Sequence, residues 1–379
     1  MKKTRQPNGQ TRLIVATSES DADLLYATRF WAPDPFIFLQ QNGKRTLVLS
    51  DLEIDRARRQ AKANEFVAYS DLERELQGKS RTVPGYEKVL VHFLRGRGVR
   101  SAIVPSSFPL GYAREVTANK IKLQPTNGQF WPERARKSTD EVRKMEQAMR
   151  ITEAGMAQGI EVLRRARRGP GNKLRWNGKP LTSEILRAEI DSAVLRAGGT
   201  PHGTIVAGGD QACDPHERGS GPLLADSLII IDIFPRDSHT GYFGDMTRTV
   251  IRGRASGAQR KLWETVRAGQ ALALRRIKAG VDGAAIHKAI QDLFSDRGFP
   301  TEVRKGRRVG FFHGTGHGLG LEIHEYPRLQ KVVLNAGEVV TVEPGLYYPG
   351  LGGVRIEDVV VVTGTGSKMI SRFPKQLEI

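Results

Sequence analysis

Apolar residues recur with two different spacings along the chain, and the change of spacing divides the chain into two parts. Up to about residue 128, short apolar runs alternate with stretches of helical spacing, which is typical of an α/β unit. Asn42-Gly43 lies between two apolar runs and predicts a tight hairpin turn. The predicted strands are 13–16, 36–41, 45–49, 102–104 and 121–123, and the predicted helices are 51–63, 85–96 and 109–119.

Longer helices are predicted after a boundary at 125–132. Ser138 and Glu141 have the spacing of a helix-capping box, and the apolar residues after them recur at three, four or seven positions. They predict one helix that ends by Gly169. Its core-facing stripe contains three methionines and consists of Val142, Met145, Met149, Met156, Ile160 and Leu163. The elements expected next are a loop at 171–180, a helix at 182–197 and strands at 204–206, 228–232 and 245–250.

The same order of elements then repeats. A long helix at 257–279 and a second one from 282 to Gly298 precede further strands. Each half has a long helix, a shorter helix and a pair of strands, so we expect a pseudo-twofold α+β domain whose helical hairpins cover one face of the sheet. The predicted domains are a smaller α/β domain at 1–128 and this α+β domain at 129–379.

Three of the eight histidines lie within twelve residues, at His313, His317 and His324, in a segment with glycine at 314, 316, 318 and 320. Glycine lets a backbone run close past an ion or substrate and adopt angles that other residues avoid. The segment therefore predicts a functional site. The alternative is a glycine-rich loop that carries surface histidines.

Four acidic residues stand in or beside apolar runs that predict buried strands: Asp232, Asp245, Glu343 and Glu357. A buried carboxylate has to be paired or to bind a metal ion. With one histidine, these acids form an oxygen-rich ligand set, unlike the sets typical of structural zinc or of copper. Two ions about 3.5 to 4 Å apart would use four acids and would hold a hydroxide between them. The alternatives are a structural metal site and a set of buried salt bridges.

The motifs around these residues resemble those of the pita-bread metallopeptidases, and most of all the branch of Xaa-Pro aminopeptidases and Xaa-Pro dipeptidases (prolidases). The motifs are Asp232 and the segments 244–249, 313–325, 341–347 and 352–358. The resemblance is strong over 130–379, and looser over 12–128, which is similar to the N-terminal domain of that branch. It implies a pita-bread (creatinase/aminopeptidase-like) catalytic domain that hydrolyses the peptide bond before proline with a metal-bridging hydroxide.

The resemblance also implies a role for each metal ligand. Asp232 would bind one ion, His317 and Glu343 the other, and Asp245 and Glu357 would bridge both. Manganese is the expected metal, with cobalt and zinc as alternatives. Glu343 would also relay a proton from the nucleophile to the leaving amine.

Five further residues match substrate-side positions of the family. His324 would steady the scissile carbonyl oxygen, His216 would be a second substrate-side histidine, and His313 would line the proline pocket. Arg355 would orient the ligands behind the metal centre. Arg328 would bind the free carboxylate of a dipeptide, which favours a dipeptidase over an aminopeptidase. The alternative for each is a packing or surface residue.

One spacing departs from the family pattern. Asp232 and Asp245 are thirteen positions apart, two more than is typical, so Asp237 is an alternative first ligand. We prefer Asp232, because it ends a predicted buried strand, whereas Asp237 falls in a polar turn at 235–240.

The net charge of +18 raises a rival class, a nucleic-acid-binding protein. The densest basic runs, 164–168 and 304–308, contain no aromatic residues and match no base-reading module. We therefore expect no specific nucleic-acid binding. A second rival is a pita-bread binding protein that has lost its metal, with a basic nucleic-acid-binding surface, or a metal-free hydrolase; the complete ligand set argues against both.

The remaining composition is that of an ordinary globular protein, with 39% hydrophobic and 26% charged residues. Its apolar runs fall short of the roughly 20 residues that span a membrane, and residues 1–5 are not followed by the apolar stretch of a signal peptide. The single cysteine, Cys213, predicts a buried thiol without an internal disulfide. We expect a cytoplasmic protein that acts on proline-containing peptides, and the family resemblance implies a homodimer.

Overall fold

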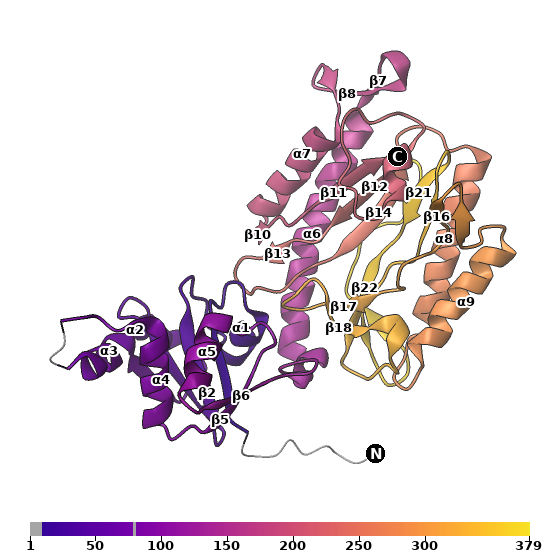
Figure 1. The fold of residues 1–379 in the computed structure, drawn as a ribbon. Helices are drawn as coiled ribbons and strands as arrows, with labels where there is room; N and C mark the ends of the chain where they lie inside the picture. Colours follow the sequence, from indigo (N-terminus) through magenta and orange to yellow (C-terminus); the bar gives the residue numbers. More distant parts are fainter. Residues whose placement is uncertain (1–9, 79–80) are drawn as a thin grey trace. The chain divides into compact units, whose positions relative to one another are not determined.

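The computed structural model describes residues 10–78 and 81–379, which form two compact units (Figure 1). The N-terminal unit ends at Pro132, and the C-terminal unit runs from Glu133 to Ile379. The sequence placed this boundary after residue 128. Each unit is described by itself below.

A six-stranded sheet forms the centre of the N-terminal unit, with the strand order β4-β3-β2-β1-β5-β6. Strands β1, β2 and β3 pair antiparallel, and β4, β5 and β6 join in parallel. Asn42 and Gly43 both have positive φ, 51° and 79°, so the predicted Asn-Gly hairpin turn is present. The strands are β1 (Arg12–Ala16), β2 (Phe36–Gln41), β3 (Lys44–Leu49), β4 (Glu65–Ala68), β5 (Ser101–Val104) and β6 (Lys122–Pro125).

Helices pack on both faces of this sheet. Alternate residues of β1 point to opposite faces, as strand geometry requires: Leu13 and Val15 join one apolar core with α4 and α5, and Ile14 joins another with α1 and α2. The sequence prediction missed β4 and two of the helices, α1 and α3, because α1 has only seven residues and α3 has no fully buried residue. The helices are α1 (Ala22–Thr28), α2 (Ile54–Gln60), α3 (Tyr69–Gln77), α4 (Tyr86–Gly96) and α5 (Leu110–Ala118).

The first half of the C-terminal unit begins with α6 (Thr139–Arg165). The predicted capping box is present: the Glu141 amide donates to Ser138 Oγ, and the Ser138 amide donates to the Glu141 carboxylate. The methionine stripe is buried as expected, except that Val142 at its start is half-buried. Helix α7 (Ser183–Arg196) packs against α6, and both cover an antiparallel sheet made of β11 (Ile205–Gly208), β12 (Leu228–Ile233) and β14 (Met246–Ile251).

The expected loop at 171–180 was a wrong prediction. This segment contributes to a small antiparallel sheet made of β7 (Arg167–Arg168), β8 (Leu174–Trp176) and β9 (Lys179–Pro180). The turn between β8 and β9 contains Asn177 and Gly178, both with positive φ. It is the same Asn-Gly hairpin signal as in the N-terminal unit. A second short pair joins β10 (Gly199–Thr200) to β13 (Arg236–Asp237).

The second half repeats the first, as predicted. Helices α8 (Gly257–Arg276) and α9 (Gly283–Asp296) pack on a five-stranded sheet of order β18-β17-β19-β22-β23 and on two hairpins, β15-β16 and β20-β21. The sheet strands are β17 (His317–Gly318), β18 (Glu325–Arg328), β19 (Val339–Val342), β22 (Asp358–Val362) and β23 (Ser367–Met369). The hairpin strands are β15 (Glu302–Arg304), β16 (Arg307–Val309), β20 (Gly345–Tyr348) and β21 (Gly352–Arg355).

The two halves join along β14. The amide of Glu357 donates to the Thr247 carbonyl over 3.1 Å, and the amide of Arg355 donates to Thr249 Oγ1 over 3.0 Å. In Figure 1 the strands lie between the α6-α7 pair and the α8-α9 pair. The junction of the halves is where the predicted acids lie.

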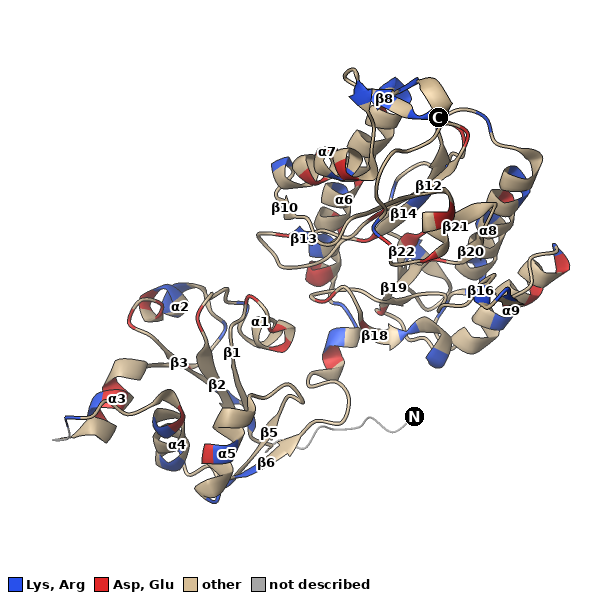
Figure 2. Ribbon diagram, turned by 45° about the horizontal axis from the view of Figure 1, so that its top comes forward, with Lys and Arg blue, Asp and Glu red and all other residues tan. Residues whose placement is uncertain are grey.

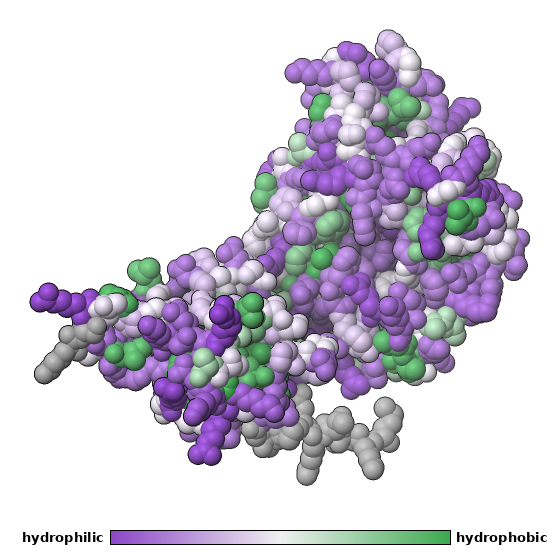
Figure 3. All heavy atoms as spheres, viewed as in Figure 1, coloured by the Kyte–Doolittle hydropathy of each residue, from purple (hydrophilic) through white to green (hydrophobic). Residues whose placement is uncertain are grey.

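Charge and hydropathy differ between the interior and the surface. Figure 2 shows acidic residues around β21 and β22, inside the C-terminal unit, basic residues around β8, and residues of both signs on the helices. The face shown in Figure 3 is mostly hydrophilic. Among the described residues, no helix combines the length and apolarity that crossing a membrane requires. Cys213 is buried, as expected, and burial raises the pKa of its thiol to about 12.

Candidate metal centre

The four predicted acids stand at strand ends where the two halves meet. Asp232 is the fifth residue of β12, and Asp245 directly precedes β14. Glu343 directly follows β19, and Glu357 lies between β21 and β22. Strand ends fix the backbone of each acid while leaving the side chain free to point out of the sheet.

Glycines allow the backbone segments of this region to approach one another. A Cβ atom on Gly244 would lie 2.6 Å from the Ala148 carbonyl oxygen of α6, and one on Gly316 would lie 1.9 Å from the Thr341 carbonyl oxygen of β19. The close neighbours of these glycines are protein atoms, and the four glycines of the histidine segment have no positive φ. The expectation of unusual backbone angles at these glycines was therefore wrong. Gly316 and Gly318 allow backbone to pack against backbone, whereas Gly314 and Gly320 make room for the side chains of Gln330 and Glu325.

Asp245, His317 and Glu357 offer ligand atoms that all lie within 4.8 Å of one another. The His317 Nε2 atom is 3.6 Å from Asp245 Oδ2 and 3.5 Å from Glu343 Oε1. The His317 Nδ1 atom lies 3.1 Å from the Gly318 carbonyl, so Nδ1 carries the proton and the Nε2 lone pair faces the acids. A neutral imidazole in this orientation can bind a metal ion through Nε2.

Burial and mutual repulsion shape the protonation of these groups. Burial, and then the Glu357, Asp232 and Glu343 carboxylates, raise the pKa of Asp245 well above its ordinary value. Burial, with Glu343 and Asp232, does the same to the pKa of Glu357. Burial raises the pKa of Glu343 to about 7, although Arg355 opposes it. Burial, with a contribution from His324, lowers the pKa of His317 to about 3.

These residues fit divalent cations. Asp245, Glu343 and Glu357 have no ion pair with lysine or arginine among residues 10–78 and 81–379, and the buried Asp232 Oδ1 atom has no hydrogen-bond partner. Buried carboxylates without a countercharge are costly, and cations would remove that cost. The donor set of carboxylate oxygens and one imidazole suits hard or borderline divalent ions.

Arg355 ties the ligands to the substrate side. Its Nη2 donates to Asp232 Oδ2 over 2.7 Å, and its Nη1 donates to the Tyr347 hydroxyl over 3.0 Å. The Tyr347 hydroxyl in turn lies 2.8 Å from His313 Nε2. His313 Nδ1 lies 2.9 Å from the Gly314 carbonyl, and burial, with Arg355 adding to it, lowers the pKa of His313 to about 3. His313 is therefore neutral, and its Nε2 accepts a hydrogen bond from the Tyr347 hydroxyl.

A buried ion cluster holds the residue next to His324. Lys137 Nζ is 2.5 Å from Glu325 Oε1, and Arg134 Nη2 is 2.7 Å from Glu325 Oε2. Burial works against ionisation of Glu325, but the Lys137 and Arg134 cations hold its pKa below the usual range. The His324 ring stands edge-on to the His317 ring, 4.4 Å between centroids. The cluster thus fixes the backbone on which His324 projects beside the proposed ligand.

One cavity of about 500 Å³ collects every residue that the sequence proposed for the site. The metal-ligand set Asp232, Asp245, His317, Glu343 and Glu357 lines it, together with His216, His313, His324, Arg328 and Arg355. His216, His324 and Arg328 are exposed in it.

Asp237, the alternative first ligand, does not line the cavity. It is buried, and its Oδ1 accepts hydrogen bonds from the amides of His239 and Thr240. The sequence placed Asp237 in a polar turn, whereas the structure places it, buried, at the end of β13, directly before the turn.

The sequence profile of metallopeptidase family M24 matches residues 143–364. The chain belongs to metallopeptidase family M24. As an M24 metallopeptidase it is a hydrolase of peptide bonds, of a family that binds divalent metal ions. Its residues 143–364 contain all ten predicted site residues.

Curated and solved relatives agree with this membership. The chain is 27% identical over 315 residues to the Xaa-Pro dipeptidase of Pyrococcus horikoshii, covering 81% of this chain and 84% of the relative. The solved Xaa-Pro dipeptidase from Bacillus anthracis superposes with a TM-score of 0.81 at 23% identity, over 98% of this chain and 95% of that one. The X-Pro aminopeptidase from Thermotoga maritima gives a TM-score of 0.80 at 22% identity, over 98% of both chains. The M24 protein therefore has the pita-bread fold that its motifs predicted.

The sequence prediction missed several residues that line the cavity of this M24 protein: His202, Ile205, Phe234, Phe312, Ile323 and Gln330. The His202 ring stands edge-on to Phe234, 6.1 Å between centroids. Phe312 directly precedes the histidine segment and Phe234 lies two residues after Asp232, so proximity to the motifs was a usable signal for both. His202 and Gln330 carry no motif of their own.

Proposed function

We propose that this M24 protein is a two-metal peptidase that cleaves the bond before proline, as an Xaa-Pro dipeptidase with Xaa-Pro aminopeptidase as the alternative. The observation that carries the proposal is the convergence of four acids and His317 on one cavity, where three of the acids have no lysine or arginine partner among residues 10–78 and 81–379. The names of the relatives in this family support the substrate class.

The proposed ligands are the five predicted ones. Asp232 would hold one ion, His317 and Glu343 the other, and Asp245 and Glu357 both, with manganese as the preferred metal and cobalt or zinc as alternatives. When bound, a pair of divalent ions supplies an activated water nucleophile and polarises the substrate carbonyl. The chain supplies the geometry, because Arg355 holds Asp232 and Thr247 Oγ1 donates to Glu357 Oε2 over 2.8 Å.

Protons would move through Glu343 and charge would be steadied by His324. Glu343 would take the proton of the nucleophile and pass it to the leaving proline nitrogen, because a carboxylate beside the nucleophile can act first as a base and then as an acid. His324, exposed in the cavity beside His317, donates to the carbonyl oxygen as negative charge develops there. His216 and His313 line the remaining wall, with His313 fixed by Tyr347 on the proline side.

Arg328 favours the dipeptidase over the aminopeptidase. Its exposed side chain lines the cavity, and it makes no ion pair with any residue in the described ranges 10–78 and 81–379. The alternative was that Arg328 pairs with a surface acid. No such ion pair is present among the described residues. A free planar guanidinium beside a peptide site suits the carboxylate at the end of a dipeptide.

Peptide turnover tests the proposal. Metal-free protein is loaded with manganese and given an Xaa-Pro dipeptide, a tripeptide with proline second and a Pro-Xaa dipeptide. The account predicts hydrolysis of the Xaa-Pro dipeptide, little of the tripeptide and none of the Pro-Xaa peptide. Hydrolysis of the tripeptide alone would overturn the dipeptidase in favour of the aminopeptidase, and turnover of neither would overturn the proposed function.

We further propose that the N-terminal unit is the creatinase/prolidase-like N-terminal domain of this branch, and that the protein is a cytoplasmic homodimer. The family relationship supports the first and the dimer, and the single buried thiol is consistent with a reducing compartment. Light scattering of the purified protein measures the oligomeric state directly.

A further inference from the structure

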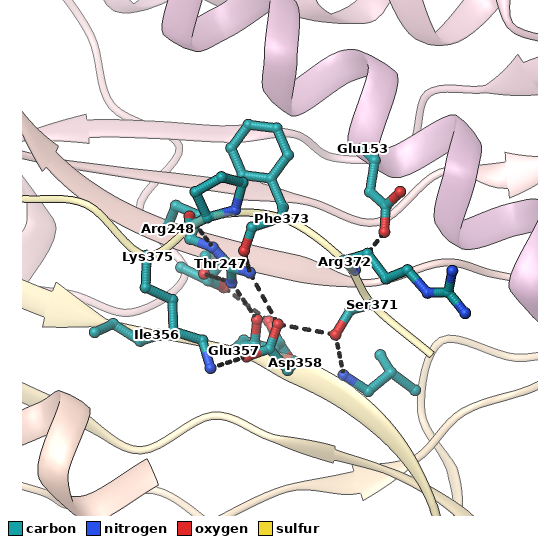
Figure 4. Close-up of polar contacts among 12 residues, drawn as sticks. Glu153, Thr247, Arg248, Ile356, Glu357, Asp358, Ser371, Arg372, Phe373 and Lys375 are labelled. Atoms are coloured by element: carbon teal, nitrogen blue, oxygen red, sulfur yellow. Dashed lines mark hydrogen bonds and ion pairs between the residues drawn. The ribbon is translucent and has the colours of Figure 1, made fainter. Parts of the chain in front are cut away.

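Glu357 and Asp358 are neighbours in the chain with opposite surroundings. Glu357 faces the cavity among other acids, whereas the Asp358 carboxylate is held by two cations (Figure 4). Arg248 Nη2 is 2.8 Å from Asp358 Oδ1, and Lys375 Nζ is 2.5 Å from Asp358 Oδ2. The Arg248 and Asp358 side chains are 3% and 1% exposed. A buried ion pair directly behind a proposed ligand raises the question of what it positions.

Arg248 uses its whole guanidinium to tie three segments together. Its Nη1 donates to the carbonyls of Thr247 and Glu357, over 2.9 and 2.6 Å. Its Nη2 and Nε donate to the carbonyls of Phe373 and Pro374, over 2.8 and 3.1 Å. Strand β14, the turn that carries Glu357 and the segment 371–375 therefore meet at one side chain.

One of the two carbonyls that accept from Arg248 Nη1 belongs to Glu357 itself. The other belongs to Thr247, which orients the Glu357 carboxylate. Thr247 accepts the Glu357 amide and donates its hydroxyl to Glu357 Oε2 over 2.8 Å. Arg248 thus fixes the backbone of the proposed ligand and of the residue that aims it. Among the described residues, Arg248 makes no hydrogen bond to a carboxylate that lines the cavity, so it acts through Thr247 and the Glu357 backbone.

The segment 371–375 holds Arg248 in place. Ser371 Oγ donates to Asp358 Oδ1 over 2.8 Å and accepts the Val359 amide over 3.2 Å. With Lys375 on the second carboxylate oxygen, Asp358 is bound from both sides (Figure 4). A lysine in place of Arg248 would lack the planar fork that reaches four carbonyls and a carboxylate together.

We propose that Arg248, locked by Asp358 and the segment 371–375, is a positioning residue that sets the affinity of the metal centre by orienting Glu357. The proposal rests on the proposed metal site. Residues that orient metal ligands from behind affect both metal affinity and turnover, which separates this role from simple stabilisation of the fold.

Arg248→Lys, compared with Arg252→Lys, tests the proposal. Arg252 follows β14 and donates to the carbonyls of Ala166 and Ile379 over 3.2 and 3.4 Å, away from the ligands, so it is a matched control. Competition with a chelating dye measures manganese affinity in the absence of substrate. We expect Arg248→Lys to weaken manganese binding at least about tenfold and to lower kcat with little change in KM, and Arg252→Lys to do neither.

Wild-type manganese affinity and kcat in a folded Arg248→Lys protein would overturn the positioning role alone. Absence of metal binding in the wild-type protein would instead overturn the proposed function. If Arg248→Lys does not fold, Lys375→Met is compared with Lys368→Met, which removes an equal charge from an ion pair with Glu146 outside the cluster. Weaker manganese binding in Lys375→Met, restored by Lys375→Arg, supports the proposal, and equal affinity in the two methionine variants contradicts it.

Discussion

The C-terminal unit buries acids in two different ways. Glu325 and Asp358 are each surrounded by two cations of the protein, Lys137 with Arg134 and Arg248 with Lys375. Asp245, Glu343 and Glu357 lie close by with no lysine or arginine paired to them among the described residues. The fourth cavity acid, Asp232, is paired with Arg355, so three of the four cavity acids have no countercharge among the described residues. The difference supports the proposal that the unpaired cavity acids bind cations from solution.

The largest expected effect comes from removing one unpaired acid. Glu357→Gln takes away the proposed bridging ligand while keeping the shape and the Thr247 contact. We expect peptidase activity to fall by about a thousandfold, roughly 4 kcal/mol in the activation barrier, and metal content to fall with it. The same substitution at a paired acid, Glu325→Gln, should leave metal content unchanged. Equal metal content in the two variants would contradict the claim that the unpaired acids bind metal and the paired acids do not.

The choice between Asp232 and Asp237 gives the next largest effect. Asp232→Ala should lose one of the two ions and most activity, because its Oδ1 is an unpartnered atom at the cavity. Asp237→Ala should keep both ions and lose only stability, because its Oδ1 caps the turn at His239 and Thr240. Mass spectrometry of the metals bound by each variant decides between them, and full metal content in Asp232→Ala would refute the assignment.

Arg328→Met removes a cation that has no acidic partner in the part of the chain that the structure describes. We expect KM for an Xaa-Pro dipeptide to rise about tenfold or more, since a charged hydrogen bond to the substrate carboxylate is lost, while the tripeptide is unaffected. Arg297→Met, an exposed arginine at the end of α9, is the control. A uniform change for both peptides would show that Arg328 does not bind the carboxylate.

The paired cluster beside His324 is expected to give a smaller effect. Lys137→Met leaves a buried Glu325 with Arg134 alone, so the loop of His324 should loosen and kcat should fall about tenfold. The double variant Lys137→Met/Glu325→Gln removes the unbalanced charge and should recover part of that loss. If the double variant is no better than Lys137→Met, the charge balance is not what positions His324.

The smallest effect is on the pH dependence of stability. Burial raises the pKa of Glu343 from 4.5 to about 7, so the metal-free folded chain keeps a proton that the unfolded chain releases. Its contribution to stability is full below 4.5 and is lost as the pH rises to about 7. The melting temperature of metal-free protein should therefore drop by several degrees across this range, and manganese should reduce the drop. If the melting temperature of metal-free protein rises with pH across this range, the change has the opposite sign to the prediction and contradicts it.

Local signals made much of this molecule predictable. The Asn-Gly hairpin at 42–43, the capping box at Ser138 and the five ligand motifs depend on neighbouring residues, and the structure contains the predicted elements around them. The α1 and α3 helices were missed because they are short or lack a buried stripe. The carbonyl contacts of Arg248 join residues more than a hundred positions apart, so no spacing in the sequence reports them.

Calorimetric titration of metal-free protein with manganese tests the central claim that the unpaired acids form a site for two cations. The account predicts two equivalents bound per chain in the wild-type protein and fewer in Glu357→Gln. Absence of binding in the wild-type protein, or two equivalents in both, would contradict it.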